Sequence, residues 1–267
     1  MIGIQKLEAN IQFKYIIALF ILFYFIAELR SQVPDNESFS YPAGLTLQAG
    51  LGSYAVKDRY ISPEKYSGIM PFYCIGWSHC HERNVYNLNF SFRQSEEIIN
   101  NNVTTRIIQF RFSQGFLYPL KPFKVTGKRL GFWLGPTTDI AYYVNNPDIA
   151  VSGFDYTNSY VTMVSLGFRG DALYHISKRL FLKSSLQFTM VSLGLRTVDR
   201  EEDDQPGAKI LSPLSGQNGS FTLGIAYNAF RWLTVNVTYR SDLTRVAGWE
   251  HIISAGNSGV VGLTIRF

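Results

Sequence analysis

Apolar and polar residues alternate along most of the chain after residue 41. Tyr86, Leu88 and Phe90 are separated by Asn87 and Asn89. The same period of two recurs within 86–93, 108–113, 164–169, 186–191, 221–228, 233–240 and 261–267. Strict alternation is typical of β-strands that bury one face and expose the other to a different environment. Because no amphipathic helix of comparable strength is evident, the pattern predicts an all-β protein.

The alternating segments define about ten strands, although eight or twelve are also compatible with the pattern. The predicted strands are 42–55, 66–79, 85–95, 104–118, 130–145, 160–175, 180–197, 219–230, 233–246 and 257–267. A transmembrane β-strand needs about 9 to 11 residues in the apolar band. These strands are therefore long enough to cross a membrane and to project beyond it.

The connectors between these strands alternate in length. Three are short (80–84, 176–179 and 229–232), whereas 119–128 is longer than its neighbours on that side. The connectors 56–65, 96–103, 146–159, 198–218 and 247–256 are long and polar. Short periplasmic turns that alternate with long outer loops are expected of a transmembrane antiparallel up-and-down β-barrel with an even strand number. Both chain ends then lie on the short-turn side.

Aromatic residues near the strand ends predict two interfacial girdles. On the short-turn side they are Trp77, Tyr86, Tyr118, Trp133, Tyr174, Phe181, Phe230, Trp232 and Phe267; on the long-loop side they are Tyr54, Tyr66, Tyr143, Tyr160 and Tyr239. Tyr and Trp gather at both membrane–water interfaces of membrane proteins. A soluble β-sandwich would explain the alternation, but not paired girdles or the rhythm of the connectors.

The first residues form an apolar segment of the kind that directs export. Residues 15–27, YIIALFILFYFIA, carry no charge and follow Lys6 and Lys14. This segment is shorter than the roughly 20 residues of a membrane-spanning helix but fits the core of a signal peptide. We therefore predict a signal peptide over 1–31, with Ala27 as an alternative cleavage point, a short N-terminal segment over 32–40, and a barrel over 41–267.

Composition and charge narrow the function classes. Hydrophobic residues make up 46% of the chain and charged residues 17%, and the net charge is +5. The basic residues form no run, so no nucleic-acid partner is expected. The two cysteines, Cys74 and Cys80, are too far apart on an extended strand for a disulfide. No CxxC pair is present, so they indicate neither a zinc nor a redox site.

The chain ends in GVVGLTIRF, Gly259 to Phe267, which predicts a last strand with Val261, Leu263 and Ile265 toward lipid. Thr264 and Arg266 would face the lumen, Phe267 would lie in the periplasmic girdle, and the strand would pair with the first one near 45–51. With the signal peptide, the alternating strands and the girdles, this ending resembles the small outer-membrane β-barrel proteins of Gram-negative bacteria, in the broad OmpA/OmpX-like sense. The resemblance implies location in the cell outer membrane, contact with its lipids, and recognition of the last strand by the barrel-assembly machinery.

Enzymatic alternatives were sought among the histidines. His79 and His81 flank Cys80, but no second pair of ligands accompanies them. His175 and Ser177 resemble the His-x-Ser of outer-membrane lipid A deacylases, but Lys178 stands where that family has Asn. The acidic residues 199–204 and the later His251 lack the Asp-x-His spacing of the omptin proteases. We therefore expect no enzyme, no catalytic, cofactor-binding or metal-binding residue, and no cofactor.

The inward faces of the predicted strands carry charged residues. They are Arg93, Arg111, Asp139, Arg169, Asp171, Lys183, Arg240, Asp242 and Arg266. A barrel of about eight strands is filled by its own side chains, so we expect these charges to pair within a mostly plugged lumen. The sequence favours a structural or surface-interaction role, with an unknown extracellular ligand. A narrow pore for small solutes and a barrel-embedded hydrolase of lipid A deacylase or omptin type are the alternatives.

Overall fold

The computed structural model describes residues 41–59, 65–81, 84–100, 103–125, 128–148, 158–198, 207–213, 215–247 and 251–267. The predicted signal peptide over 1–31 and the segment 32–40 lie outside these residues, so both stay predictions. Within the described ranges, no helix is long and apolar enough to cross a membrane.

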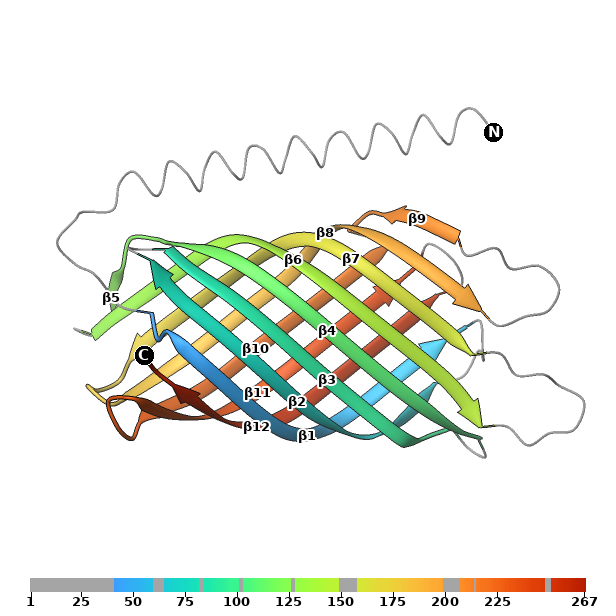
Figure 1. The fold of residues 1–267 in the computed structure, drawn as a ribbon, viewed down its shortest axis with the longest axis horizontal. Helices are drawn as coiled ribbons and strands as arrows, with labels where there is room; N and C mark the ends of the chain where they lie inside the picture. The colour runs from blue at the N-terminus through green and yellow to red at the C-terminus, as the bar shows by residue number, and fades with distance from the viewer. Residues whose placement is uncertain are drawn as a thin grey trace, which may run out of the picture.

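Ten long antiparallel strands close into a barrel (Figure 1). They are β1 (Gly44–Asp58), β2 (Tyr66–His81), β3 (Asn84–Asn100), β4 (Val103–Pro119), β6 (Lys128–Asp148), β7 (Ser159–His175), β8 (Leu180–Val198), β10 (Gly216–Asn228), β11 (Leu233–Val246) and β12 (Ile252–Ile265). Two short strands extend the wall: β5 (Phe123–Val125) pairs with β6, and β9 (Gly207–Leu211) pairs with β8. The predicted fold class and strand number are confirmed.

The last strand closes the barrel as the sequence predicts. β12 pairs with β11 on one side and with β1 on the other, where Leu45 lies opposite Ile265 and Leu51 opposite Gly259. Val261 and Leu263 are exposed on the outer face, and the intervening Thr264 is buried. Because every long strand has two neighbours, no long edge is left to template aggregation.

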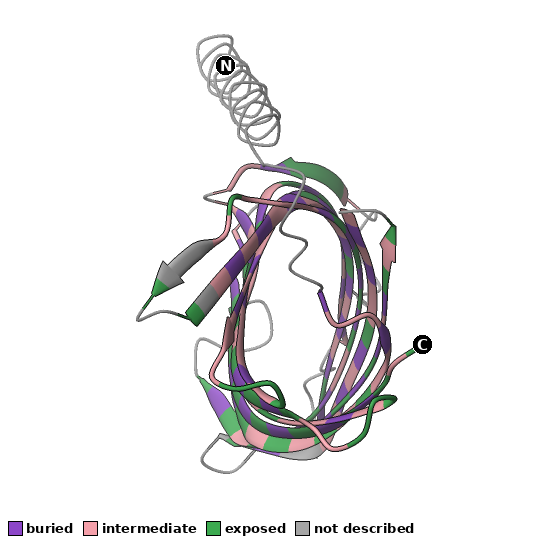
Figure 2. Cartoon of the chain, turned by 90° about the vertical axis from the view of Figure 1, so that its left-hand side faces the viewer, coloured by how far each residue is buried: buried purple, intermediate pink, exposed green. Residues whose placement is uncertain are grey.

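The outer face of the barrel is apolar. Exposed residues such as Leu51, Ile69, Leu166 and Val261 recur at every second position around the wall, and Figure 2 shows exposed and buried residues alternating along the strands. Soluble monomers rarely expose contiguous apolar patches larger than a few hundred Å². Polar residues line the inside instead, so the soluble sandwich is excluded and the barrel is a transmembrane one.

Several strand ends differ from the prediction. The third connector, expected over 96–103, is limited to 101–102, because β3 and β4 continue as a hairpin. The expected long loop 198–218 contains β9, which extends the ladder of β8 from Ser192 to Arg196. Polar residues in these segments hid the strands, since a strand that extends beyond the membrane no longer needs an apolar face.

Five of the predicted girdle aromatics lie inside the barrel. Tyr54, Tyr66, Tyr143, Trp133 and Phe181 are all buried, each at most 6% exposed. They occupy inward positions of their strands, so they contact the lumen and not the interface. The outward aromatics that remain at the short-connector end include Trp77, Tyr86, Tyr118, Tyr174, Phe230, Trp232 and Phe267.

A bulge changes the phase of β8. Leu166 lies opposite Val191 but the next residue, Gly167, lies opposite Thr189, so Met190 has no partner on β7. A bulge shifts the inward and outward positions by one residue beyond it. Phe168, which the alternation places outside, is buried next to this shift, with its ring 6.2 Å from that of Phe188.

Candidate functional site in the barrel interior

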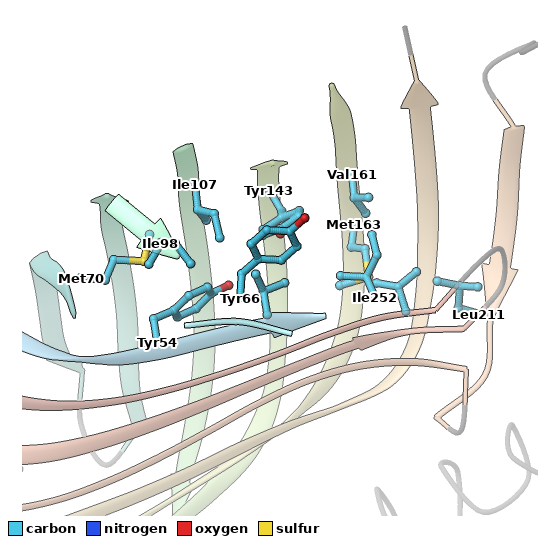
Figure 3. Packing of buried hydrophobic residues seen from close by; sticks show 12 residues of the cluster. Tyr54, Tyr66, Met70, Ile98, Ile107, Tyr143, Val161, Met163, Leu211 and Ile252 are labelled. Carbon is cyan, nitrogen blue, oxygen red and sulfur yellow. The ribbon is translucent and has the colours of Figure 1, made fainter. Parts of the chain in front are cut away.

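The long-connector end of the lumen is filled by an apolar layer rich in tyrosine, here called the tyrosine layer. It consists of Tyr54, Val56, Tyr66, Met70, Ile98, Ile107, Tyr143, Val161, Met163, Leu211, Val246 and Ile252. Figure 3 shows these side chains pointing toward one another from opposite walls. All come from the parts of their strands next to the connectors at this end. The layer therefore occupies the lumen on the side of the longer connectors.

A second apolar layer, here called the tryptophan layer, occupies the short-connector end. Its members are Tyr41, Val85, Leu117, Trp133, Leu173, Phe181 and Ala226. Tyr41 precedes β1, and its ring meets that of Trp133 edge-on at 5.1 Å. The Cys80 thiol donates to the Tyr41 carbonyl oxygen at 3.5 Å. Tyr41, just before β1, thus lies in the lumen mouth and packs within this layer.

Asp242 is the centre of the charged zone between the two layers. Arg240 on the same strand donates to both of its oxygens at 2.8 Å. Arg93 reaches across the lumen from β3 to the same carboxylate, and Arg111 lies 3.5 Å away on β4. Gly256 leaves the space that Arg93 occupies, since a Cβ there would stand 2.3 Å from Nη1. One carboxylate therefore ties three strands together.

Arg111 links this centre to a second carboxylate. Its Nε donates to Asp139 at 2.6 Å, and both residues are buried. The other Asp139 oxygen accepts from the amide of Asn218 at 3.1 Å. Thr244 donates to Asn218 in turn, at 2.9 Å. A buried charge is tolerated when it is paired and hydrogen-bonded in this way.

A further charged group lies beside the tryptophan layer. Arg169 donates to both oxygens of Asp171, at 2.8 and 3.0 Å. Ser185 and the Tyr41 hydroxyl also donate to this carboxylate. Lys183 lies over the ring of Tyr41, with Nζ 4.7 Å from the centroid, and among the described residues it forms no ion pair. Asp171 is thus fully engaged by Arg169, Ser185 and Tyr41, and Lys183 lies near it without a direct ion pair.

One buried ion pair was missed by the sequence reasoning. Arg196 on β8 donates to Asp58 on β1 at 2.9 Å and to Ser159 at 3.2 Å. Asp58 had been assigned to a loop because β1 was ended at residue 55. Alternation counted from Leu186 places Arg196 outward, and the bulge at Met190 turns it inward. Continuing the alternation of β1 by three residues would have indicated Asp58.

The predicted inward charges lie where the alternation placed them, with one exception. Arg93, Arg111, Asp139, Arg169, Asp171, Lys183, Arg240 and Asp242 form the groups described above. Arg266 does not belong to them. It follows the end of β12, where its backbone N–H donates to the Trp232 carbonyl at 2.8 Å and its side chain is half-buried. Inward alternation stops where the strand stops.

A cavity of about 140 Å³ lies between the charged zone and the tryptophan layer. Its wall is formed by polar side chains from β1, β2, β3, β4, β7, β8, β10, β11 and β12, among them Gln48, Asn87, Ser113, Gln187 and Asn236. Each ordered water needs roughly 10 to 15 Å³ of such space. The cavity therefore has room for several waters or for one small solute.

The residues considered for catalysis serve local structure. Ser177 Oγ accepts hydrogen bonds from the backbone N–H groups of Arg179 and Leu180, at 3.3 and 3.1 Å, and so stabilises the turn between β7 and β8. The His175 ring stacks on Phe181, and the His79 ring on Trp77.

Both cysteines are free thiols. Within the described ranges, no three His, Cys, Asp or Glu side chains are placed to hold a metal ion. The acidic residues 199–204 lie outside the residues that the structure describes.

Comparison with known proteins identifies the fold of this chain but no sequence family. The sequence matches no family model and no curated protein. The barrel superimposes on the outer membrane protease OmpT of Escherichia coli with a TM-score of 0.52 and 9% identity, covering 86% of this chain and 99% of that one. The transport unit of the Escherichia coli autotransporter AIDA-I gives 0.47 at 12% identity, covering 91% and 97%. Neisserial surface protein A gives 0.38 at 11%, covering 85% and 100%. The chain has the closed β-barrel fold of the Gram-negative outer-membrane proteins.

Proposed function

We propose that this protein is a non-enzymatic outer-membrane barrel whose lumen is closed to free passage of solutes, and that it acts as a structural or surface-interaction protein. The observation that carries the proposal is the layered interior. Apolar side chains fill both ends of the lumen, and ion pairs cross it between them. A closed interior leaves the outer wall and the connectors as the surfaces that can meet a partner.

The barrel exterior supports placement in the outer membrane. Its apolar outward face and the aromatic residues at the short-connector end match what a bilayer and its interface require. The short-connector end, where both Gly44 and Phe267 lie, would face the periplasm. The longer connectors would then face the cell exterior and offer the contact surface for an unidentified ligand.

A narrow pore is the second candidate, because a polar cavity lies behind one of the two layers. The two candidates differ in the conductance of the purified protein in planar lipid bilayers. We expect no stepwise current from the native protein, since the two apolar layers and the ion pairs between them would block a continuous aqueous path. Reproducible steps of uniform size would contradict the closed lumen and favour the pore.

Opening both layers should create conductance. A variant with Tyr54→Ala and Tyr143→Ala at one end and Trp133→Ala and Phe181→Ala at the other removes four buried rings. We expect stepwise currents that prefer anions, because cationic side chains line the cavity beyond. The matched control replaces the exposed Phe230 and Trp232 by Ala and should stay silent.

Folding of the opened variant must be checked first, because each buried Phe or Trp replaced by Ala costs about 3 to 5 kcal/mol. A folded barrel migrates differently on a gel before and after heating. Should the fourfold variant fail to fold, Tyr41→Ala with Tyr54→Ala opens one position in each layer with less loss. Silence from a folded, opened variant would show that the apolar layers are not what closes the lumen.

A further inference from the structure

We infer that the polar cavity beside the tryptophan layer is a binding site for a small oxyanion of the size of phosphate. The side chains that line it include four cations, Arg111, Arg169, Lys183 and Arg240, and no Asp or Glu. Three of these cations pair with Asp139, Asp171 and Asp242, none of which lines the cavity. A solute in the cavity therefore meets a positively charged surface.

Three buried side-chain donors that line the cavity have no hydrogen-bond partner among the described residues. Arg111, Asn87 and Gln187 all line the cavity, and they are 8%, 4% and 5% exposed. Arg111 Nη2, Asn87 Nδ2 and Gln187 Nε2 have no hydrogen-bond partner in the part of the chain that the structure describes. All three are N–H donors. Buried donors are satisfied in native proteins, and leaving one unpaired costs free energy.

Lys183 adds a positive charge to these donors. Its ammonium contacts the Tyr41 ring and forms no ion pair within the described ranges. Hydroxyl groups complete the wall, among them Ser113, Ser220, Thr222 and Thr238. An oxyanion accepts hydrogen bonds on several oxygens at once, from guanidinium, ammonium, amide and hydroxyl donors alike. Water supplies acceptors too, but it carries no charge, whereas the lining holds four cations and no carboxylate.

The interior also holds Arg93 and Arg196. These two interior cations lie outside the lining of the cavity, and both are held by carboxylates, Asp242 and Asp58. The tyrosine layer separates the cavity from the long-connector end. Pro42 and Phe181 line the cavity on its other side, so exchange of the ion would require transient opening of the tryptophan layer. The predicted site is independent of any role of the outer surface.

The test is isothermal titration of the folded barrel in detergent with sodium phosphate, against sodium chloride of equal ionic strength. We expect saturable binding of phosphate with a stoichiometry of one. Lys183→Gln should weaken that binding by roughly tenfold or more, because it removes the one lining cation that no ion pair holds among the described residues. Lys178→Gln, the same change in the exposed turn between β7 and β8, should bind as the native protein does.

A second variant protects the test against misfolding. Gln187→Leu removes an unpartnered donor and orphans no partner, so it should fold and still bind phosphate several-fold more weakly. Sulfate and succinate titrations then separate tetrahedral oxyanions from carboxylates as the preferred class. The inference is overturned if phosphate gives no heat beyond that of chloride, or if Lys183→Gln and Gln187→Leu both bind as Lys178→Gln does.

Discussion

Asp242→Asn is expected to lower the free energy of unfolding by about 3 to 5 kcal/mol, the cost of removing one partner from a buried ion pair. The change keeps the shape of the side chain but leaves Arg93 and Arg240 without a carboxylate. Arg111 keeps Asp139. The loss is measured by unfolding the barrel in denaturant in lipid vesicles and following the heat-modifiable band.

A double-mutant cycle between Asp242 and Arg240 is the control for this prediction. Arg240→Gln removes one of the charges that Asp242→Asn strands, so the double variant should lose less stability than the sum of the two single losses. Residues in one ion-pair network show interaction energies of about 0.5 to 3 kcal/mol. Additive losses, or a loss below about 1 kcal/mol for Asp242→Asn, would show that the three guanidiniums do not depend on this carboxylate.

Val261→Arg should cost about 2 to 4 kcal/mol, the penalty for arginine on the lipid face near the bilayer midplane. Val261 is exposed on β12, and its partners Ala49 and Val237 lie on β1 and β11. Ile253→Arg is the matched control on the same face, at the start of β12. It should cost only about 0 to 1 kcal/mol because it lies near the interface.

The two losses are measured as the free energy of folding of each variant into lipid vesicles whose bilayer thickness is known. Equal losses at the two positions would mean that β12 is not crossing the bilayer along its length. A smaller loss at Val261 than at Ile253 would place the apolar band elsewhere on the wall. The expected order distinguishes a membrane barrel from a soluble one, in which both arginines would face water at little cost.

The alternation of side chains was sufficient to predict the strands, the closure and most of the interior charges. The alternation pattern did not identify the aromatic layers, because an aromatic residue near a strand end has two possible explanations. An aromatic ring near a strand end fits both an interface and a lumen filled by side chains, and strand position decides between them. Trp133 and Tyr143 share the inward positions of Asp139, and Phe181 shares those of Lys183. The tyrosine and tryptophan layers could have been predicted from that agreement.

Other parts of the site could not be predicted from one sequence. The bulge at Met190 has no local signal, yet it decides that Arg196 faces Asp58. The approach of Arg93 to Asp242 depends on how far the ten strands shear as they close. The polar cavity is a result of the same closure, because its wall combines residues of nine long strands. Long-range geometry of this kind is set by the complete ladder.

Cys74 offers the most direct test of the closed lumen. The thiol is 6% exposed and lies in the interior beside Phe72 and Val260. With Cys80→Ser, it is the single thiol in the sequence. The measurement is its rate of modification by a small cationic methanethiosulfonate, added to the folded barrel in lipid vesicles. A closed and cationic lumen predicts a rate at least about a hundredfold below that of the denatured chain, limited by rare opening of the barrel. Modification of the folded barrel at the rate of the denatured chain would contradict the closed lumen.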